Sequence, residues 1–263
     1  MAERQNHIAS VLKAVALIDE LAKQPGERSL TELATVTGQP LPTAHRLLST
    51  LEYAGWLTHS NHGYALSLRM AEIGGHVLSG ISVRTEALAP MQELTRRTGE
   101  TSYLGIREGD HVLCVERVES MDMVRVMSWD VGKVLPLRVG GAALAILSCQ
   151  TEAEASRIVS QTRVHGDLPD AASDEKLLGS LPEFRRQGYA VSSEEIIPGI
   201  SSIGAPVFGP NGRLAAAVSV GGLTPRIMGN LHEVAATLVA TAEEVSRRLG
   251  YVADYPPSWP PAA

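Results

Sequence analysis

Apolar residues near the start of the chain recur every three or four positions, which is the spacing of an amphipathic helix. The residues that carry this period are Ile8, Val11, Leu12, Val15, Ile18 and Ala22. Pro25-Gly26 must end the helix, because proline cannot continue one. A second helix begins at Ser29, which forms a capping box with Glu32, and Gly38 supplies the left-handed residue that closes it.

A third helix follows after a connection of only a few residues. Pro40 and Pro42 fit its first turn, where backbone amides lack partners in any case. On a helical wheel the apolar residues share one face, namely Leu41, Ala44, Leu47, Leu48, Leu51 and Ala54. The opposite face holds Pro42, His45, Arg46, Ser49 and Tyr53, with Thr43 beside it. We therefore expect the first face to be buried and the second to be free to contact a partner.

Two short strand-like segments come next, at residues 56–58 and 64–66, on either side of His59-Ser60-Asn61-His62-Gly63. A loop that contains Asn and Gly between such segments predicts a hairpin. Two helices, a tight glycine turn, a third helix and a hairpin are the order of a winged helix-turn-helix, in which the third helix enters the DNA major groove. A generic three-helix bundle remains the alternative from the pattern alone.

The rest of the chain predicts a linker and then a second, α+β domain. A helix is expected over residues 67–79, and Ser82 can cap a further helix, which Pro90 should break before residues 91–97. Strands are expected over residues 101–106, 112–118, 123–129, 189–192, 203–208 and 213–220. Helices are expected over residues 140–147, 177–187 and 224–249, with a second capping box at Thr151 and Glu154. Because hairpin turns join several strands, the sheet should be mainly antiparallel.

Composition and charge narrow the possible functions. The chain has 263 residues, 44% of them hydrophobic, and a formal net charge of −6. No apolar run reaches the roughly 20 residues of a membrane helix, the first residues lack a signal-peptide pattern, and Cys114 and Cys149 match no zinc or redox spacing. We expect a cytoplasmic protein with no metal, cofactor or membrane partner. Because residues 1–80 are not basic, any DNA binding must depend on local geometry and dimer symmetry.

Catalytic motifs are weak along the whole chain. The S-x-x-K spacing occurs at Ser10 and at Ser173, but the companion motifs of serine acyl-transfer enzymes are absent. Glu194 and Glu195 are adjacent, so their side chains point to different sides and make a poor acid/base pair. We therefore expect no catalytic residues.

Short motifs stand in a fixed order along nearly the whole chain. In the first part they are Leu30-Thr31-Glu32-Leu33-Ala34, Gly38, Thr43-Ala44-His45-Arg46-Leu47-Leu48, Leu51, Gly55 and Tyr64-Ala65-Leu66. In the second they are Gly99-Glu100-Thr101, Leu135-Pro136-Leu137, Gly188-Tyr189, Glu194-Glu195, Gly199 and Ala205-Pro206-Val207. Their order and spacing resemble the IclR family of bacterial transcription regulators.

The resemblance implies both an architecture and a function. It implies a winged helix-turn-helix in residues 1–68, a dimerising linker helix in 69–89 and a GAF-like effector domain in 90–250. The four prolines of residues 251–263 predict an extended tail after these domains. Such a protein binds a double-stranded DNA operator as a homodimer or tetramer, often as a repressor, and responds to a small organic effector, often a carboxylate or an aromatic compound. The alternative is a GAF-like small-molecule-binding enzyme whose helical first segment serves only for dimerisation.

The resemblance also places DNA contacts on the third helix, at Thr43 and Arg46. An arginine there can bind guanine O6 and N7 with two hydrogen bonds or hold a phosphate. His45 and Ser49 share the face, and His59, Asn61 and His62 stand in the hairpin loop. The alternative for Arg46 is a solvated side chain paired with Glu52 or Asp19.

The effector pocket that the resemblance implies lies in the second domain. The matching residues are Met127, Leu135, Gly140, Gly141, Ala142, Ser192, Ile200, Ser202 and Ser219. Serine hydroxyls and the amides that open the helix at Gly140 can hold a carboxylate. The alternative is that this segment is small only to pack tightly against the sheet. The chain departs from the family at Ala143-Leu144-Ala145, usually Gly-Lys-Ala, at Arg138, usually His, and at Ser202, frequently Cys.

Overall fold

The computed structural model describes residues 7–122, 129–162, 173–210 and 212–257, without the side chains of residues 77–79. The chain divides into two compact units, Met1–Gly80 and Ile81–Ala263. Most of the strand expected over residues 123–129 lies outside the described residues, and so does Met127, one of the expected effector contacts.

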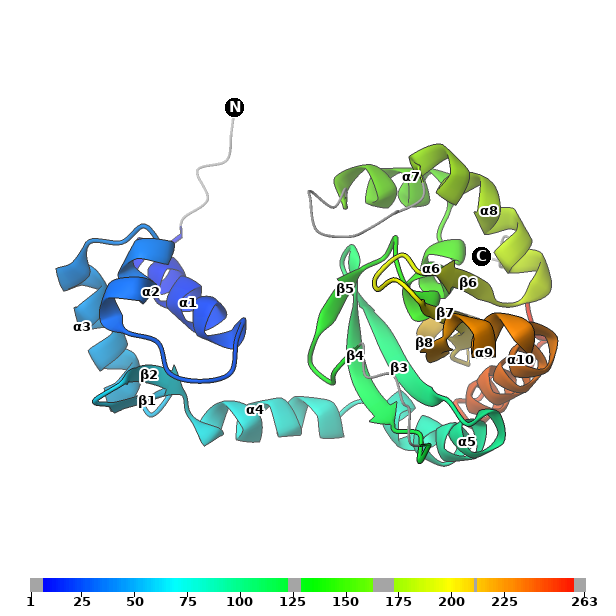
Figure 1. Cartoon of the computed structure of the whole chain (residues 1–263), viewed down its shortest axis with the longest axis horizontal. Helices are drawn as coiled ribbons and strands as arrows, with labels where there is room; N and C mark the ends of the chain where they lie inside the picture. Colours follow the sequence, from blue (N-terminus) through cyan, green and yellow to red (C-terminus); the bar gives the residue numbers. More distant parts are fainter. Residues whose placement is uncertain (1–6, 123–128, 163–172, 211, 258–263) are drawn as a thin grey trace. The chain divides into compact units, whose positions relative to one another are not determined.

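The first unit contains helices and one hairpin (Figure 1). Its described elements are α1 (Ala9–Ala22), α2 (Leu30–Val36), α3 (Leu41–Tyr53), β1 (Leu57–Ser60), β2 (Gly63–Leu66) and α4 (Leu68–Ser79). The strands pair antiparallel with Ser60 opposite Gly63, so Asn61 and His62 alone form the turn between them. The hairpin is confirmed, with longer strands and a shorter loop than the sequence indicated.

A small leucine core holds this unit together. Leu17 of α1, Leu33 of α2 and Leu48 of α3 are fully buried, and all three belong to one cluster. The local signals that position the helices are also present. Ser29 accepts a hydrogen bond from the Glu32 amide while its own amide donates to the Glu32 carboxylate, so the capping box is confirmed. The order of elements is that of a winged helix-turn-helix.

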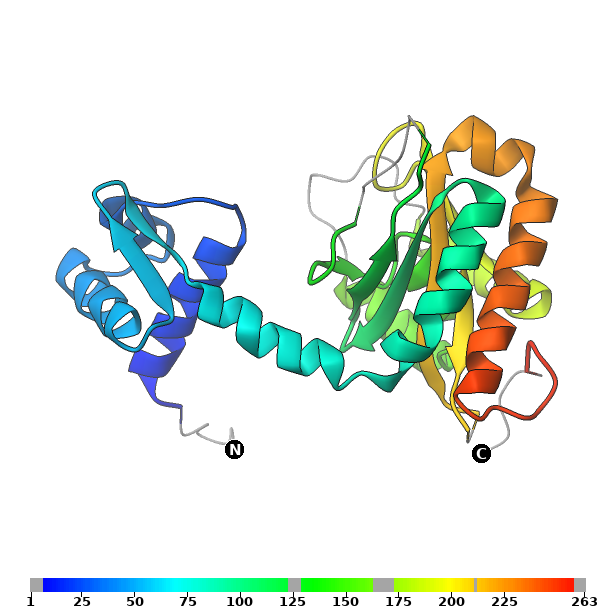
Figure 2. The same ribbon diagram turned by 90° about the horizontal axis from the view of Figure 1, so that it is seen from below.

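The second unit is built around one antiparallel sheet. Its described elements are α5 (Ser82–Thr98), β3 (Thr101–Glu108), β4 (His111–Val118), β5 (Val134–Pro136), α6 (Gly141–Ser148), α7 (Glu152–Gln161), α8 (Asp174–Gln187), β6 (Ala190–Ser193), β7 (Ile200–Phe208), β8 (Leu214–Leu223), α9 (Thr224–Gly229) and α10 (Leu231–Arg248). The strand order is β5-β4-β3-β8-β7-β6, and every neighbouring pair is antiparallel. Helices α5 and α10 pack side by side on one face, whereas α6 and α8 lie on the other (Figure 2). The α+β class is confirmed.

Helix α6 lies directly on the sheet, backbone against backbone. A Cβ atom on Gly204 of β7 would lie 2.2 Å from the carbonyl oxygen of Gly141, and one on Gly141 would lie 2.5 Å from the carbonyl carbon of Ile203. Both distances are far shorter than any real contact, so both positions require glycine. The close approach of the helix to the sheet is thus by itself a reason for a glycine at position 141.

Several helix predictions were wrong in detail. Pro90 does not break a helix, because α5 runs through it and the proline is itself buried against the core, which offsets the lost backbone hydrogen bond. The long helix expected from Thr224 is two helices, since α9 ends at Gly229 and α10 starts at Leu231. The second capping box is only half formed: Thr151 accepts from the Glu154 amide, but the Glu154 side chain binds arginines instead.

The end of the chain also differs from the extended tail that was expected. Tyr251 is buried, and its ring packs against Phe208 of β7 with ring centres 5.6 Å apart. The Tyr255 hydroxyl donates to the Pro206 carbonyl at 2.6 Å, and the Pro256 ring lies against Gly188. Aromatic side chains thus hold the first half of the proline-rich segment on the second unit.

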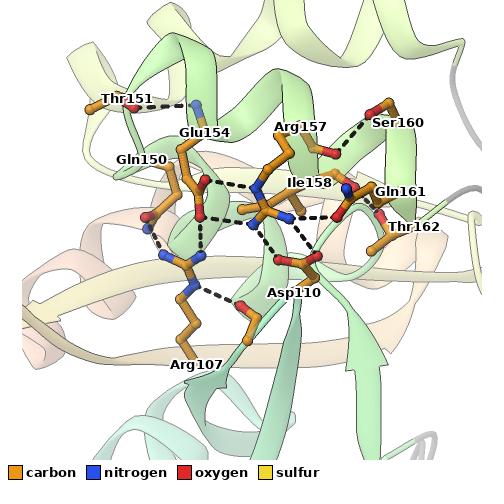
Figure 3. Close-up of polar contacts among 11 residues, drawn as sticks. Arg107, Asp110, Gln150, Thr151, Glu154, Arg157, Ile158, Ser160, Gln161 and Thr162 are labelled. Carbon is orange, nitrogen blue, oxygen red and sulfur yellow. Dashed lines mark hydrogen bonds and ion pairs between the residues drawn. The ribbon is translucent and has the colours of Figure 1, made fainter. Parts of the chain in front are cut away.

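A network of charged side chains ties the turn between β3 and β4 to α7 (Figure 3). Arg157 of α7 binds both carboxylate oxygens of Asp110 in the turn, at 2.9 and 2.6 Å. The Glu154 carboxylate bridges Arg157 and Arg107, and Arg107 also donates to Gln150. Two-point contacts between arginine and carboxylate fix orientation as well as distance. The network therefore fixes the position of α7 against the turn between β3 and β4.

Candidate nucleic-acid interface and ligand cavity

Helix α3 turns one polar face away from its own unit. Ala44 and Leu48 are fully buried, whereas His45 and Arg46 are exposed and Ser49 lies half-buried at the margin. Thr43, in the first turn, is also half-buried. The outward face expected from the wheel is therefore present as a surface.

Two details of that wheel were wrong. Leu41 and Ala54 were assigned to the buried face, but both are exposed, Leu41 with 47% of its surface accessible. They stand at the two ends of α3, beyond the middle turns that pack on α1, α2 and β1. The periodicity of a helix defines a face along its whole length, but neighbouring elements cover only part of it.

The alternative role for Arg46 was an ion pair with Glu52 or Asp19. Within the described residues, the structure gives the Arg46 guanidinium neither of these partners. Glu52 lies instead 4.0 Å from Nδ1 of His59 on the hairpin. Arg46 is thus an exposed cation on the polar face of α3.

Side-chain contacts fix α3 against the neighbouring helices. Gln39, in the connection between α2 and α3, is buried and donates from Nε2 to the carbonyl of Lys13 on α1 at 3.0 Å. The backbone amide of Gln39 donates to the Ala34 carbonyl at 2.9 Å, and this hydrogen bond closes α2. Pro40 then precedes the first turn of α3, where a missing amide hydrogen costs nothing. The short connection therefore fixes the angle at which α3 leaves α2.

The hairpin loop contains fewer of the expected residues than the sequence suggested. His59 lies within β1 rather than in the loop, and its ring stacks on Tyr64 with ring centres 4.2 Å apart. Asn61 and His62 form the exposed tip, and the His62 amide donates to the Ser60 hydroxyl. The structure thus places Asn61 and His62 where a duplex could reach them, with His59 one step behind.

A small cavity opens at the start of α6 in the second unit. It encloses about 30 Å³, roughly the room of one or two water molecules. Six expected effector residues line it: Leu135, Gly140, Gly141, Ala142, Ser202 and Ser219. Ser192 and Ile200 are not in its wall, and Met127 lies outside the described residues. Six of the nine expected residues therefore meet at one cavity, and whether an effector binds there stays a prediction.

The other residues of the cavity wall were not among the effector contacts expected from the sequence. These are Tyr103, Val112, Trp129, Val139, Ala143, Ile196 and Gly221. Tyr103 and Trp129 bring aromatic rings, with centres 6.0 Å apart, from two different parts of the chain. The cavity is thus mainly apolar and aromatic, with two serines beside the first turn of a helix.

Polar groups converge on the start of α6. The Gly141 amide donates to the Ser202 hydroxyl at 2.9 Å, and the Gly140 amide donates to the Ser192 hydroxyl at 3.1 Å. In the described part of the chain, no acceptor is found for the backbone amides of Ala142 and Ala143, two residues of the cavity wall. Free amides and the helix dipole make a helix start a favourable place for an anion.

Arg138, which replaces the family's usual histidine, does not face solvent. Its side chain is buried and donates to the Val159 carbonyl and to the Asp174 carboxylate, both at 3.1 Å. It connects the segment before α6 to α7 and α8. Its charge is therefore already compensated within the fold.

The described residues provide neither a metal site nor a readily ionised thiol. Within the described ranges, no group of three His, Cys, Asp or Glu side chains is placed to hold a metal ion. Burial raises the pKa of Cys114 and of Cys149 to about 12, so neither thiol ionises readily near neutral pH. Nor does any described helix combine the length and apolar character needed to cross a membrane.

Comparison with known proteins covers both units. Residues 10–60 match the family model of the IclR helix-turn-helix domain, and residues 75–247 match that of the bacterial transcriptional regulator IclR C-terminal domain. The chain is 32% identical over 250 residues to the HTH-type transcriptional regulator KipR of Bacillus subtilis, covering 94% of this chain and 99% of KipR. It is 28% identical over 242 residues to the HTH-type transcriptional repressor AllR of Escherichia coli, covering 90% of this chain and 89% of AllR.

Solved structures share the same fold. The IclR protein of Thermotoga maritima superimposes with a TM-score of 0.73 at 27% identity, covering 93% of this chain and 100% of that one. An IclR homolog from Microbacterium hydrocarbonoxydans complexed with 4-hydroxybenzoate gives a TM-score of 0.78 at 20% identity, covering 91% and 98%. The curated relatives are named as transcriptional regulators, which sets the enzyme alternative aside. Since both family models match and the relatives align over nearly their whole length, this chain belongs to the IclR family of bacterial transcriptional regulators.

Proposed function

We propose that this protein is a cytoplasmic repressor whose operator binding is modulated by a small organic carboxylate or aromatic effector. The outward face of α3, with exposed His45 and Arg46 above buried Ala44 and Leu48, carries the DNA half of this proposal. The relative AllR is named as a repressor, which supports the sign of regulation. The 4-hydroxybenzoate bound to a homolog of the same fold supports the effector class.

The DNA contacts follow from which side chains are exposed. Arg46 reaches a guanine or a phosphate, because its guanidinium is exposed and can make two parallel hydrogen bonds. Thr43, His45 and Ser49 read or orient the neighbouring positions in the major groove. The hairpin residues His59, Asn61 and His62 contact the backbone or the minor groove.

An apolar stripe on α1 supports a dimer. Ile8, which caps α1, and Val11, Leu12 and Val15 within it recur at intervals of three or four residues, and they are 68%, 55%, 55% and 44% exposed. Exposed apolar side chains at this spacing suit a matching helix of a second copy. Two copies of α3 then read a palindromic operator, which gives a protein of net negative charge both affinity and specificity.

The effector half of the proposal rests on the cavity beside α6. The free amides of Ala142 and Ala143 and the hydroxyls of Ser202 and Ser219 suit a carboxylate, whereas Tyr103 and Trp129 suit an aromatic ring. Ser192 acts from behind the wall through its hydrogen bond with the Gly140 amide, and Ile200 and Met127 are kept as proposed contacts from the family resemblance alone. Because the cavity holds only about 30 Å³, an aromatic effector requires part of its wall to move.

The DNA-binding test is footprinting on the DNA upstream of the protein's own gene. We expect a protected palindrome, and Arg46→Ala should cost about 1–3 kcal/mol of specific binding if the arginine contacts a base. Arg96→Ala is the matched control, because Arg96 is an exposed arginine of α5 and its loss changes the net charge equally. Absence of any sequence-preferring protection, with the fold intact, would refute the operator-binding proposal.

The effector test fills the cavity from one wall. Ser202→Phe should leave DNA binding unchanged and abolish the response to 4-hydroxybenzoate or any other active carboxylate, because the new ring occupies the cavity. Ser193→Phe is the control, since Ser193 is exposed on the edge strand β6. A ligand titration of Ser202→Phe that matches the wild type would overturn the assignment of this cavity.

A further inference from the structure

A carboxylate of the protein itself occupies the place beside the first turn of α6. Glu195, in the loop between β6 and β7, accepts a hydrogen bond from the Ser192 hydroxyl at 2.6 Å. The same hydroxyl accepts from the Gly140 amide at 3.1 Å. Because Gly140 lines the cavity, the Glu195 carboxylate lies directly behind one wall of the proposed effector site.

Opposing effects act on this carboxylate. Burial raises the pKa of Glu195, whereas hydrogen bonds from Ser192 and from the Gly140 amide lower it. The positive charges of Arg138, before α6, and Lys176, on α8, lower it further, but burial is the largest effect. The start of α6 therefore stabilises an anion whose ionisation is already made costly by its partial removal from water.

The same loop closes the cavity. Ile196 follows Glu195 directly and lines the cavity, and its Cδ1 atom would lie 3.3 Å from a Cβ on Gly140. The loop turns back at Glu194, whose φ of 59° is left-handed and whose amide donates to the Ile200 carbonyl at 2.9 Å. Glu195, which is hydrogen-bonded to Ser192, and Ile196, whose side chain closes the cavity, are thus adjacent residues of one loop.

We propose that the Glu195 carboxylate is a built-in occupant of the anion-binding start of α6, and that a carboxylate effector binds in competition with its charge. The inference rests on the function proposed above. Two carboxylates at one helix start repel each other, because their like charges lie close together and both depend on the same positive end of the helix dipole. The effector therefore binds best when Glu195 is protonated, and binding takes up a proton from solution.

Isothermal titration of the full-length protein with benzoate, 4-hydroxybenzoate and pyruvate tests this competition. Like charges at close range shift a pKa by about one unit or more, and each unit corresponds to about tenfold in affinity. We therefore expect Glu195→Gln to bind a responding carboxylate about tenfold more tightly at pH 7.5. Wild-type affinity should rise as the pH falls from about 7.5 to about 5.5, whereas the affinity of the variant should stay flat.

Two controls isolate the charge at this position. Glu194→Gln removes the same charge from the neighbouring, exposed residue, so its affinity and pH profile should match the wild type. Benzamide is the neutral counterpart of benzoate, and its affinity should be the same in the wild type and in Glu195→Gln.

Hydrogen exchange without any ligand provides an independent measurement. Glu195→Ala removes the acceptor that orients Ser192, so exchange at the Gly140 amide and at loop residues 194–199 should become at least several-fold faster. An unchanged exchange rate would refute the proposal that Glu195 occupies the start of α6, whatever ligand the protein binds.

The remaining outcomes separate this inference from the function on which it rests. A carboxylate that binds the wild type and Glu195→Gln with equal affinity overturns the competition and leaves the effector site standing. If none of the carboxylates binds either protein, both the effector class and the competition are refuted.

Discussion

The contact between Gly204 and Gly141 allows a clean test of how α6 is held. Gly204→Ala would place a Cβ atom 2.2 Å from the Gly141 carbonyl oxygen, 2.3 Å from its carbonyl carbon and 2.6 Å from the Ala142 nitrogen. All three atoms are backbone, so no side chain can rotate away. The backbone of Gly204 is in ordinary strand conformation, and the change therefore introduces only a steric cost.

The size of the effect follows from these distances. Ordinary contact begins near 3.4 Å, so α6 and β7 must separate by about 1 Å. Overpacking of a core costs about 1–3 kcal/mol, and a backbone clash belongs at the upper end of that range. We expect Gly204→Ala to lower the free energy of unfolding of the second unit by about 3 kcal/mol and to displace the start of α6 from the cavity.

Urea denaturation followed by circular dichroism measures this change. Gly179→Ala is the matched control, because Gly179 lies inside α8 with open space around it. Replacing a helical glycine by alanine in open space should raise the free energy of unfolding by about 0.5–1 kcal/mol. If Gly204→Ala proved as stable as the wild type, α6 would not rest on β7 through the contact of Gly141 with Gly204.

Two further predictions concern local interactions in each unit. Ser29→Ala should lower the stability of the first unit by about 1 kcal/mol in thermal unfolding, because it removes the α2 cap, and an unchanged midpoint would show that the capping box is dispensable. In the second unit, Arg157 and Arg107 lower the pKa of Glu154 from 4.5 to about 2. A depressed carboxylate pKa stabilises the fold above the ordinary pKa, so this contribution should disappear as the pH falls from about 4.5 towards 2. Urea titrations of Arg157→Ala and wild type should therefore converge over that range, and a constant gap would refute this account.

Local signals explain why the first unit could be predicted almost entirely. Ser29, Glu32 and Gly38 specify a helix start and a helix end within a few residues, and the structure contains both features. The polar face of α3 also follows from spacing alone. The exposure of Leu41 could not be predicted, because it depends on where α1 and α2 stop, and that is a property of tertiary packing.

The cavity shows the limit of the same reasoning. The family resemblance found Gly140 and Ser202, whose positions follow motifs in the sequence. Tyr103, Trp129 and Ile196 come from separate strands and loops, and only the folded sheet brings them to one place. Pro90 fails as a helix breaker for a similar reason, since the burial of α5 outweighs a local preference.

The returning end of the chain bears on how shortened versions of this protein should be made. A truncation after Gly250, the domain boundary that the sequence suggests, would delete Tyr251 and Tyr255 and uncover Phe208 and the Pro206 carbonyl on β7. The freshly exposed aromatic surface would favour precipitation at the concentrations needed for crystals or spectra. Expression of the second unit alone should therefore retain residues up to Pro257, and a purification tag fits better ahead of Ile81.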